Sequence, residues 1–268
     1  MTTTIAFASL KGGVGKTTVA LNSAYAFARR GTRTLLVDMD PQGAVGMSLD
    51  GVGERSGLAG ALNTGGPLLG GAVRPKLPEL HLLPIGNIPA LEADSFAVRA
   101  HDEGLVGQLM AEAQNEYDLL ILDTPAGLGG MTRVVLESAP HVIVVAQCEP
   151  LSLRTLPRLL ELLSELRAAG RSCSLLGVVG NMSSFRDPVM LASLEEVWAY
   201  YQREVFDTAI PRDPAFLQAS RAGVPLGLLS RRPPAVAAVF DKLVAEIEER
   251  LGLGEEGSDD DGPIRLVD

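Results

Sequence analysis

The stretch from Ile5 to Arg30, IAFASLKGGVGKTTVALNSAYAFARR, decides the fold of this chain. It opens on a short apolar run that is typical of a buried strand, and it closes on a helix-forming run that Gly31 ends. The glycine-rich loop Lys11–Thr18 lies between the two. A loop placed between a strand and a helix can surround a phosphate group with backbone N–H groups. This stretch therefore predicts a phosphate-binding loop of the P-loop type.

The two residues after the last glycine of the loop carry the side chains that such a site needs. Lys16 is expected to reach the β- and γ-phosphates of a bound nucleotide, and the Thr17 hydroxyl is expected to bind Mg²⁺. A glycine turn that only packs a strand against a helix would explain neither side chain. The loop residues expected to contact the nucleotide are Gly12, Gly13, Val14, Gly15, Lys16, Thr17 and Thr18.

Lys11 places a second positive charge at the start of the loop, where it could simply be a solvated surface lysine. With Lys11 included, the loop resembles the deviant Walker A motif of the ParA/MinD superfamily of ATPases, and in particular its ParA branch. The resemblance implies that Lys11 crosses the interface of an ATP-bound homodimer to the phosphates of the partner subunit, as an arginine finger supplied in trans would. We therefore expect an ATPase with ATP and Mg²⁺ as cofactors and with Lys11 and Lys16 as catalytic residues.

Two carboxylates follow the next apolar run, in the segment LLVDMDPQG at 35–43. Residues two apart on a strand face the same side, so Asp38 and Asp40 can both face the nucleotide. Asp40-Pro41 could also simply begin a turn. The segment resembles the family's switch I region. This resemblance implies that Asp40 orients or activates the attacking water, as a catalytic residue, and that Asp38 lies near the metal ion.

A third acid ends the apolar run of LLILDTPAG at 119–127. An acid after a buried strand is the Walker B arrangement, in which Asp123 would hold Mg²⁺ through water. Taken alone, Asp123 could equally cap the next helix. The following turn, Thr124–Gly127, is similar to switch II, which senses the γ-phosphate.

The resemblance continues from about Ile5 to about Leu251. The segment QCE at 147–149 is similar to one in the ParA branch. Asn181 stands where the family reads the adenine edge with an Asn side chain, whose amide both donates and accepts. Pro211 stands where the family's backbone passes the adenine ring. The resemblance therefore implies that Asn181 and Pro211 contact the nucleotide.

Short apolar runs alternate with helical patterns along most of the chain. Strands are predicted at Ile5–Ser9, Thr34–Val37, Leu80–Leu83, Leu119–Leu122, Val142–Ala146, Leu175–Val179 and Thr208–Ile210. This order predicts an α/β fold of the three-layer P-loop NTPase type, with a mainly parallel central sheet flanked by helices on both faces. We expect one ATPase domain at 1–253, a glycine-rich surface excursion at 51–76 and a disordered acidic tail at 254–268.

The composition predicts a soluble cytoplasmic protein, because no stretch approaches about 20 uninterrupted apolar residues. Two distant cysteines and three scattered histidines indicate neither a disulfide framework nor a zinc site. The net charge is −10, and the six acids and one arginine of residues 254–268 supply −5 of it. An acidic chain argues against a polyanionic partner unless its basic residues are clustered.

Many ParA-type proteins bind duplex DNA without sequence preference through arginines, and one such position here holds Ala215. Candidate substitutes are Arg186, Arg203, Arg221, Arg231 and Arg232, although they could also be ordinary solvated arginines. The leading hypothesis is a cytoplasmic, nucleoid-associated ATPase that partitions or positions DNA or another cargo, with a ParB-like or cargo-adaptor partner that stimulates hydrolysis.

Two other classes of function use the same scaffold, and the sequence fits them less well. A membrane-surface regulator of the MinD type needs a basic C-terminal helix, whereas DDDGP at 259–263 would be repelled by anionic lipid. A metabolic enzyme on the same scaffold would be an iron-sulfur reductase or a ligase. The reductase needs cysteines near Thr124–Gly130, where there are none, and the sequence indicates no substrate pocket for a ligase.

Overall fold

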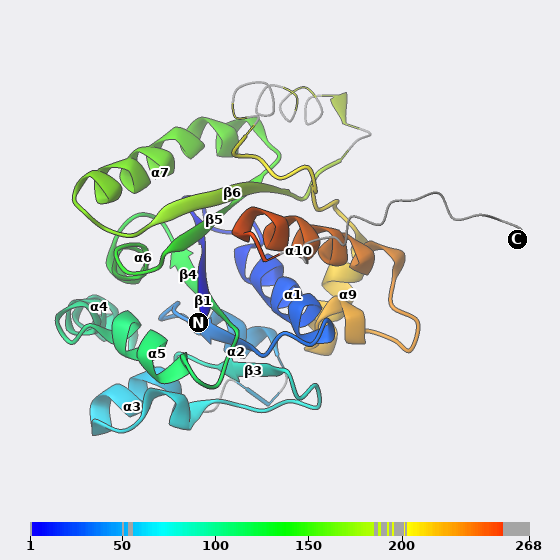
Figure 1. Cartoon of the computed structure of the whole chain (residues 1–268). Coiled ribbons are helices and arrows are strands. Elements are labelled where there is room, and N and C mark those ends of the chain that lie inside the picture. The colour runs from blue at the N-terminus through cyan, green and yellow to red at the C-terminus, as the bar shows by residue number, and fades with distance from the viewer. Residues whose placement is uncertain are drawn as a thin grey trace, which may run out of the picture.

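The structure is a computed structural model that describes residues 2–49, 51–52, 56–184, 187–188, 192, 195, 201 and 203–253. Within these residues, a six-stranded sheet has the order β3-β2-β4-β1-β5-β6, and every neighbouring pair is parallel (Figure 1). The strands are β1 (Thr3–Ser9), β2 (Thr34–Asp38), β3 (Leu80–Leu83), β4 (Leu119–Ala126), β5 (His141–Gln147) and β6 (Ser174–Asn181). The predicted α/β fold with a parallel sheet is confirmed.

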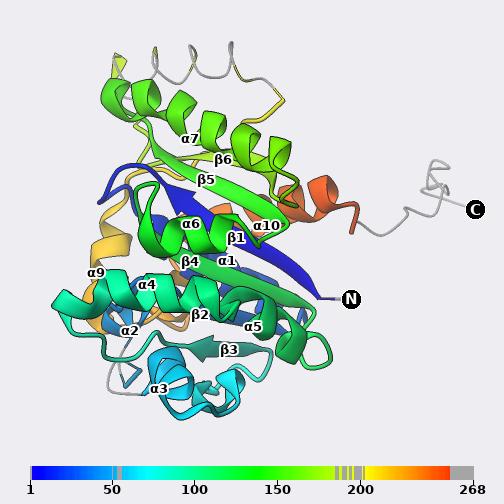
Figure 2. The same cartoon turned by 90° about the vertical axis from the view of Figure 1, so that its left-hand side faces the viewer.

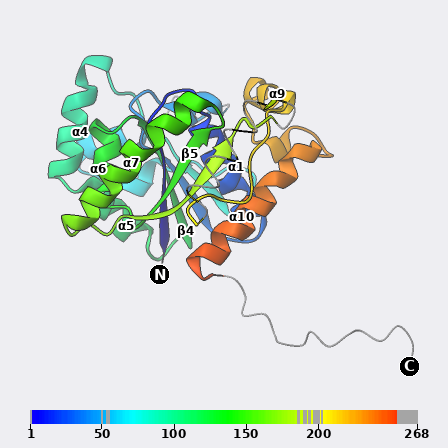
Figure 3. The ribbon, with the colours of Figure 1, turned by 90° about the horizontal axis from the view of Figure 1, so that it is seen from above.

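Helices cover both faces of the sheet, as Figures 1 and 3 show. One face carries α1 (Lys16–Arg29), α2 (Ala44–Ser48), α9 (Pro214–Ala222) and α10 (Ala238–Leu251). The opposite face, turned toward the viewer in Figure 2, carries α4 (Ala93–Asp102), α5 (Leu105–Ala113), α6 (Gly130–Leu136) and α7 (Pro150–Ala168). The short helix α3 (Gly57–Thr64) lies beside β3, and the described residues also form the 3₁₀ turns η1 (Leu68–Gly71), η2 (Ala90–Glu92), η3 (Leu226–Leu228) and η4 (Ala235–Ala237).

The middle parts of the central strands are apolar because they are buried on both sides. In β1, Ile5 and Phe7 belong to the core on the α1 face, whereas Ala6 and Ala8 belong to the core on the α4–α7 face. Alternate side chains of a strand point to opposite faces, so a strand between two helical layers needs apolar residues at every position. Burying each large side chain of this kind contributes roughly 1.5–3 kcal/mol.

Two local expectations were wrong. No strand forms at Thr208–Ile210: Ile210 N–H donates to the Gly180 carbonyl at 2.8 Å, but the pairing ends in an isolated bridge at Pro211, which has no N–H to continue a ladder. The segment 51–76 is not only a surface excursion. Leu58 and Leu68 are buried in the core, and the Leu58 N–H donates to the Pro84 carbonyl.

Both cysteines are buried free thiols, Cys148 directly after β5 and Cys173 directly before β6. Burial raises the pKa of the Cys148 thiol to about 12 and raises the pKa of Cys173 as well. Among the described residues, no helix has both the length and the apolar character needed to span a membrane. The predicted tail at 254–268 and Arg186 lie outside the described residues.

Candidate nucleotide-binding site

The carboxyl ends of β1, β2 and β4 bring the predicted phosphate and metal residues together. Parallel strands end at one edge of the sheet, which is where α/β folds bind ligands. The loop after β1 opens α1 at Lys16, while β4 carries Asp123, and these two strands are neighbours. Asp38 at the end of β2 lies opposite Asp123 in the β2–β4 register.

Asp123 is the buried centre of the site. The Lys16 ammonium donates to Asp123 Oδ1 at 2.9 Å, and the Thr17 hydroxyl donates to Asp123 Oδ2 at 2.6 Å. Lys16 is 7% exposed and Asp123 is fully buried. Burial raises the pKa of the Asp123 carboxyl, and the neighbouring Lys16 charge opposes this shift. The structure therefore joins Lys16 and Asp123, which lie 107 positions apart in the sequence, as a P-loop site requires.

The loop itself is held open by its glycines. Gly13 and Gly15 have φ angles of 77° and 84°, in the left-handed region that glycine adopts without strain. A Cβ on Gly13 would have no neighbour within 4 Å, which leaves the outer side of the loop free for a ligand. On the inner side, a Cβ on Gly15 would lie 2.3 Å from Asn181 Nδ2, so this position excludes any larger residue.

Asn181 connects the end of β6 to the loop. Its buried side-chain amide donates to the Val14 carbonyl at 2.6 Å. Pro211 lies nearby, because it bridges Ser183, two residues beyond Asn181. The two residues are therefore at the same edge as the loop. Their contact with adenine stays a prediction, since the Asn181 amide has a protein partner here.

The segment after β2 carries two acids in different surroundings. Asp38 is fully buried, and burial together with the Asp123 charge raises the pKa of its carboxyl to about 7. Asp40 is half-buried, and its Oδ1 accepts the Gln42 N–H at 2.9 Å. Of the two acids, only Asp40 is therefore partly accessible, as a residue that orients water must be.

Lys11 does not take part in the cluster around Asp123. Its side chain is 38% exposed, and its ammonium lies 3.7 Å from Glu149 Oε2. Glu149 also accepts a hydrogen bond from the Gln147 amide at 2.6 Å and lies 3.9 Å from the Arg212 guanidinium. Glu149 is a residue of this region whose role nothing in the sequence indicated, although it belongs to the QCE segment. The contact between Lys11 and Glu149 joins residues 138 positions apart, and local sequence patterns do not indicate contacts over such a distance.

Four of the candidate DNA-binding arginines are among the described residues, and all four lie on the surface. Arg221 is in the last turn of α9, and Arg231 and Arg232 lie between η3 and η4. All three are exposed, as is Arg203. Ala215, by contrast, is buried at the start of α9, where the Asp213 carboxylate accepts its N–H.

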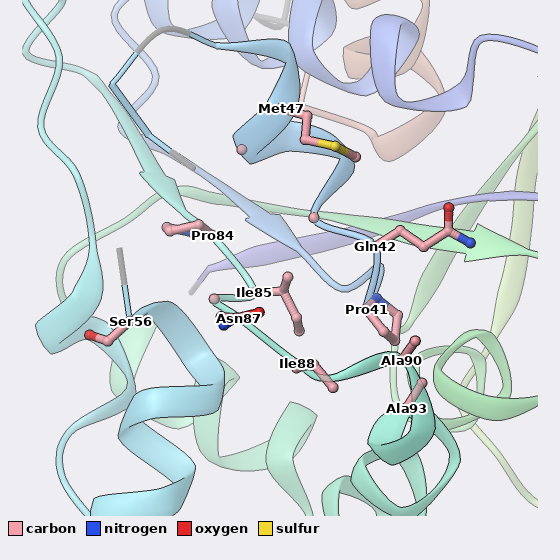
Figure 4. A pocket seen from close by; sticks show the side chains of 13 residues that line it. Pro41, Gln42, Met47, Ser56, Pro84, Ile85, Asn87, Ile88, Ala90 and Ala93 are labelled. Carbon is pink, nitrogen blue, oxygen red and sulfur yellow. The ribbon is translucent and has the colours of Figure 1, made fainter. Parts of the chain in front are cut away.

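A cleft of about 770 Å³ adjoins the Asp40 segment (Figure 4). Its walls come from the loop after β2 with α2, from the segment after β3, and from the start of α4. The lining residues are Pro41, Gln42, Gly43, Gly46, Met47, Ser56, Pro84, Ile85, Gly86, Asn87, Ile88, Ala90 and Ala93. None of these described lining residues is charged.

These contacts have the design of a P-loop nucleoside triphosphatase, since a loop lysine and threonine share one carboxylate of the neighbouring parallel strand. The AAA_31 family, an AAA domain, matches residues 2–173. The chain belongs to this family, and its relatives place it in the ParA/Soj branch of ATPases. ATP and Mg²⁺ are accordingly its ligands.

Two relatives and one solved structure illustrate the similarity. The chain is 31% identical to the chromosome-partitioning ATPase Soj of Treponema pallidum over 258 residues, which are 93% of this chain and 98% of that protein. It is 34% identical to the chromosome-partitioning ATPase Soj of Thermus thermophilus over 255 residues, covering 92% and 96%. Cobyrinic acid a,c-diamide synthase from Mycobacterium smegmatis, with a bound ATP analog and magnesium, has a TM-score of 0.78 at 28% identity, covering 93% of this chain and 95% of that one.

Proposed function

We propose that this ATPase forms an ATP-bound sandwich dimer and that hydrolysis, stimulated by a ParB-like or cargo-adaptor protein, ends each cycle of partitioning or positioning DNA or another cellular cargo. The observation that carries the proposal is the separation of the two loop lysines. Lys16 is buried and pairs with its own Asp123, whereas Lys11 is partly exposed and lies 3.7 Å from Glu149, away from Asp123. A second loop lysine of this kind is available for a partner's phosphates. The partitioning relatives support the same role.

The residues around Asp123 fit a magnesium nucleotide. A hydroxyl and a carboxylate are the hard oxygen ligands that Mg²⁺ prefers, and Thr17 and Asp123 supply them side by side. The ion would neutralise charge on the phosphates. Lys16 would turn from Asp123 toward the phosphates, and the loop N–H groups would bind their oxygens. Asp40, half-buried at the edge of this cluster, would hold the attacking water.

Replacing Asp40 with alanine is expected to leave Mg-ATP binding intact and to slow hydrolysis on the order of 10²-fold or more, because the variant loses the group that orients water. A dimer that is transient in the parent should then persist. Phosphate release and light scattering after ATP addition would measure both effects. Asp40→Asn is the matched variant, since it keeps an acceptor for the Gln42 N–H. Unchanged turnover in Asp40→Ala would assign the water to another group.

We infer that the ATP dimer also binds duplex DNA without sequence preference, which would associate it with the nucleoid. A twofold axis would double the exposed arginines at 221, 231 and 232, so that a patch too weak in one subunit becomes sufficient in two. Local charge, and not the net charge of −10, would decide this binding.

Charge reversal at Arg231 and Arg232 is expected to weaken ATP-dependent DNA binding for every sequence alike, and binding by the parent should fall steeply with salt. Mobility shifts on unrelated duplexes with ATP, ADP and no nucleotide would measure it. Arg167→Glu with Arg171→Glu is the control of equal charge change, because both residues are exposed near the end of α7, a helix that packs against β5 and β6. Deleting residues 254–268 should strengthen binding by removing −5 of charge. No ATP-dependent shift at low salt would refute DNA as the partner.

A further inference from the structure

The Asp38 carboxylate binds its own loop. Its Oδ1 accepts the Asp40 N–H at 3.0 Å, and its Oδ2 accepts the N–H groups of Val45 and Gly46 at 2.9 and 3.4 Å. These three donors are backbone groups of the segment that carries Asp40 and begins α2. The helix has Gly43 at its N-cap, which has no side chain to accept an N–H, so Asp38 supplies the missing acceptor from the strand below.

Asp123 differs from Asp38 in the kind of partner it has. The partners of Asp123 are the side chains of Lys16 and Thr17, which can turn toward phosphates and metal when a nucleotide binds. The partners of Asp38 are backbone N–H groups, and they cannot leave without a change in the loop. A fully buried carboxylate that turned to a metal ion would also leave these N–H groups without an acceptor.

We propose that Asp38 is a positioning residue, which acts through Asp40 by fixing the loop and the start of α2, and that it does not bind the magnesium ion. The N–H group that Asp38 holds belongs to Asp40 itself, the residue whose carboxylate would orient water. Val45, held by the other oxygen, is fully buried against the α1 face, so the loop is fixed at both ends. This inference rests on the proposed role of Asp40.

The same anchor shapes the cleft. Pro41, Gln42, Gly43, Gly46 and Met47 form one of its walls and all lie within the anchored segment (Figure 4). A loop released from Asp38 would move the Asp40 carboxylate and this wall together. The hydrogen bonds of Asp38 therefore determine both the position of the Asp40 carboxylate and the shape of this wall of the cleft.

Asp38→Asn tests the proposal with a side chain of the same size. Its amide keeps one acceptor oxygen but turns an NH₂ group toward N–H donors. In the nucleotide-free full-length protein, hydrogen exchange at 39–47 should become about tenfold faster or more, because local opening is easier, while 119–126 should be unchanged. The Mg²⁺ concentration for half-maximal binding of a fluorescent ADP should stay within about threefold of the parent, and kcat should fall with little change in KM.

Thr17→Ala is the control for a lost metal ligand, and it should raise that Mg²⁺ concentration about tenfold or more. The proposal is overturned if Asp38→Asn raises it to the same degree while exchange at 39–47 stays as in the parent. Should Asp38→Asn fail to fold, the parent protein still decides: the amides of Val45 and Gly46 stay protected on Mg-ADP binding if Asp38 keeps them, and lose protection if it turns to the metal. Faster exchange in Asp38→Asn together with full activity of Asp40→Ala would refute the role of Asp40 alone.

Discussion

Loss of ATP binding is the expected result of replacing Lys16 with alanine. Lys16 is the buried ammonium at the centre of the site, and no other cation contacts Asp123 among the described residues. Without Lys16, the negative charges of the Asp123 carboxylate and of the phosphates would repel each other. We expect affinity to fall on the order of 10³-fold, since charge-assisted hydrogen bonds and buried ion pairs are the strong contacts of a phosphate site. Titration with a fluorescent ATP analogue would measure it.

The variant should remain folded, because Asp123 can take up a proton. Burial already raises the pKa of this carboxyl, and removal of the Lys16 charge, which lowers it, would raise it further. A circular dichroism spectrum equal to that of the parent is the control. Binding of Mg-ATP by a folded Lys16→Ala protein at parental affinity would contradict the assignment of Lys16 to the phosphates.

Lys11→Ala should give the opposite pattern. ATP binding by the monomer should be retained, because Lys11 has no contact with Lys16, Thr17 or Asp123, whereas ATP-dependent dimers and hydrolysis should be lost. By analogy with an arginine finger, the loss of hydrolysis should be about 10³-fold or more. Nucleotide titration followed by light scattering separates the two steps. A Lys11→Ala protein that still dimerised with ATP would rule out the role in trans.

Glu149 provides the matched control for this experiment. Its ion pair with Lys11 is 3.7 Å long and partly exposed on both sides, and pairs of this kind contribute little to stability. Lys11 is therefore free to leave Glu149 when a partner subunit arrives. Glu149→Gln removes the charge but not the lysine, so it should still form ATP dimers. Loss of dimers in both variants would instead indicate that the pair itself holds the interface.

The part of the site that the sequence predicted is built from residues that are close together in the sequence. Strand, glycine loop and helix follow each other within Ile5–Arg30, and each has its own period or composition, so this unit was predicted together with Lys16 and Thr17. Asp123 was predicted because it ends a wholly apolar run. The parallel sheet was predicted because the strands are continuous apolar runs. Such runs are typical of strands buried on both faces, as the strands of parallel sheets are.

The features that escaped prediction depend on contacts between distant segments. The Asn181 amide donates to the Val14 carbonyl 167 positions away, and nothing in the sequence around Asn181 indicates this contact; its predicted contact with adenine stays a prediction. The missing strand at Thr208–Ile210 has the same origin. Its apolar residues suit a strand, but the pairing with β6 depends on where the chain returns and on Pro211.

The two buried thiols described above make the protein suited to site-specific labelling. Maleimide dyes react with thiolates, and both burial and a raised pKa keep Cys148 and Cys173 out of that form near neutral pH. A cysteine introduced at an exposed position, such as Arg203, should then be the only rapidly reacting thiol among the described residues. One population carrying a donor dye and another carrying an acceptor would report subunit exchange by energy transfer in real time, with the native cysteines left in place.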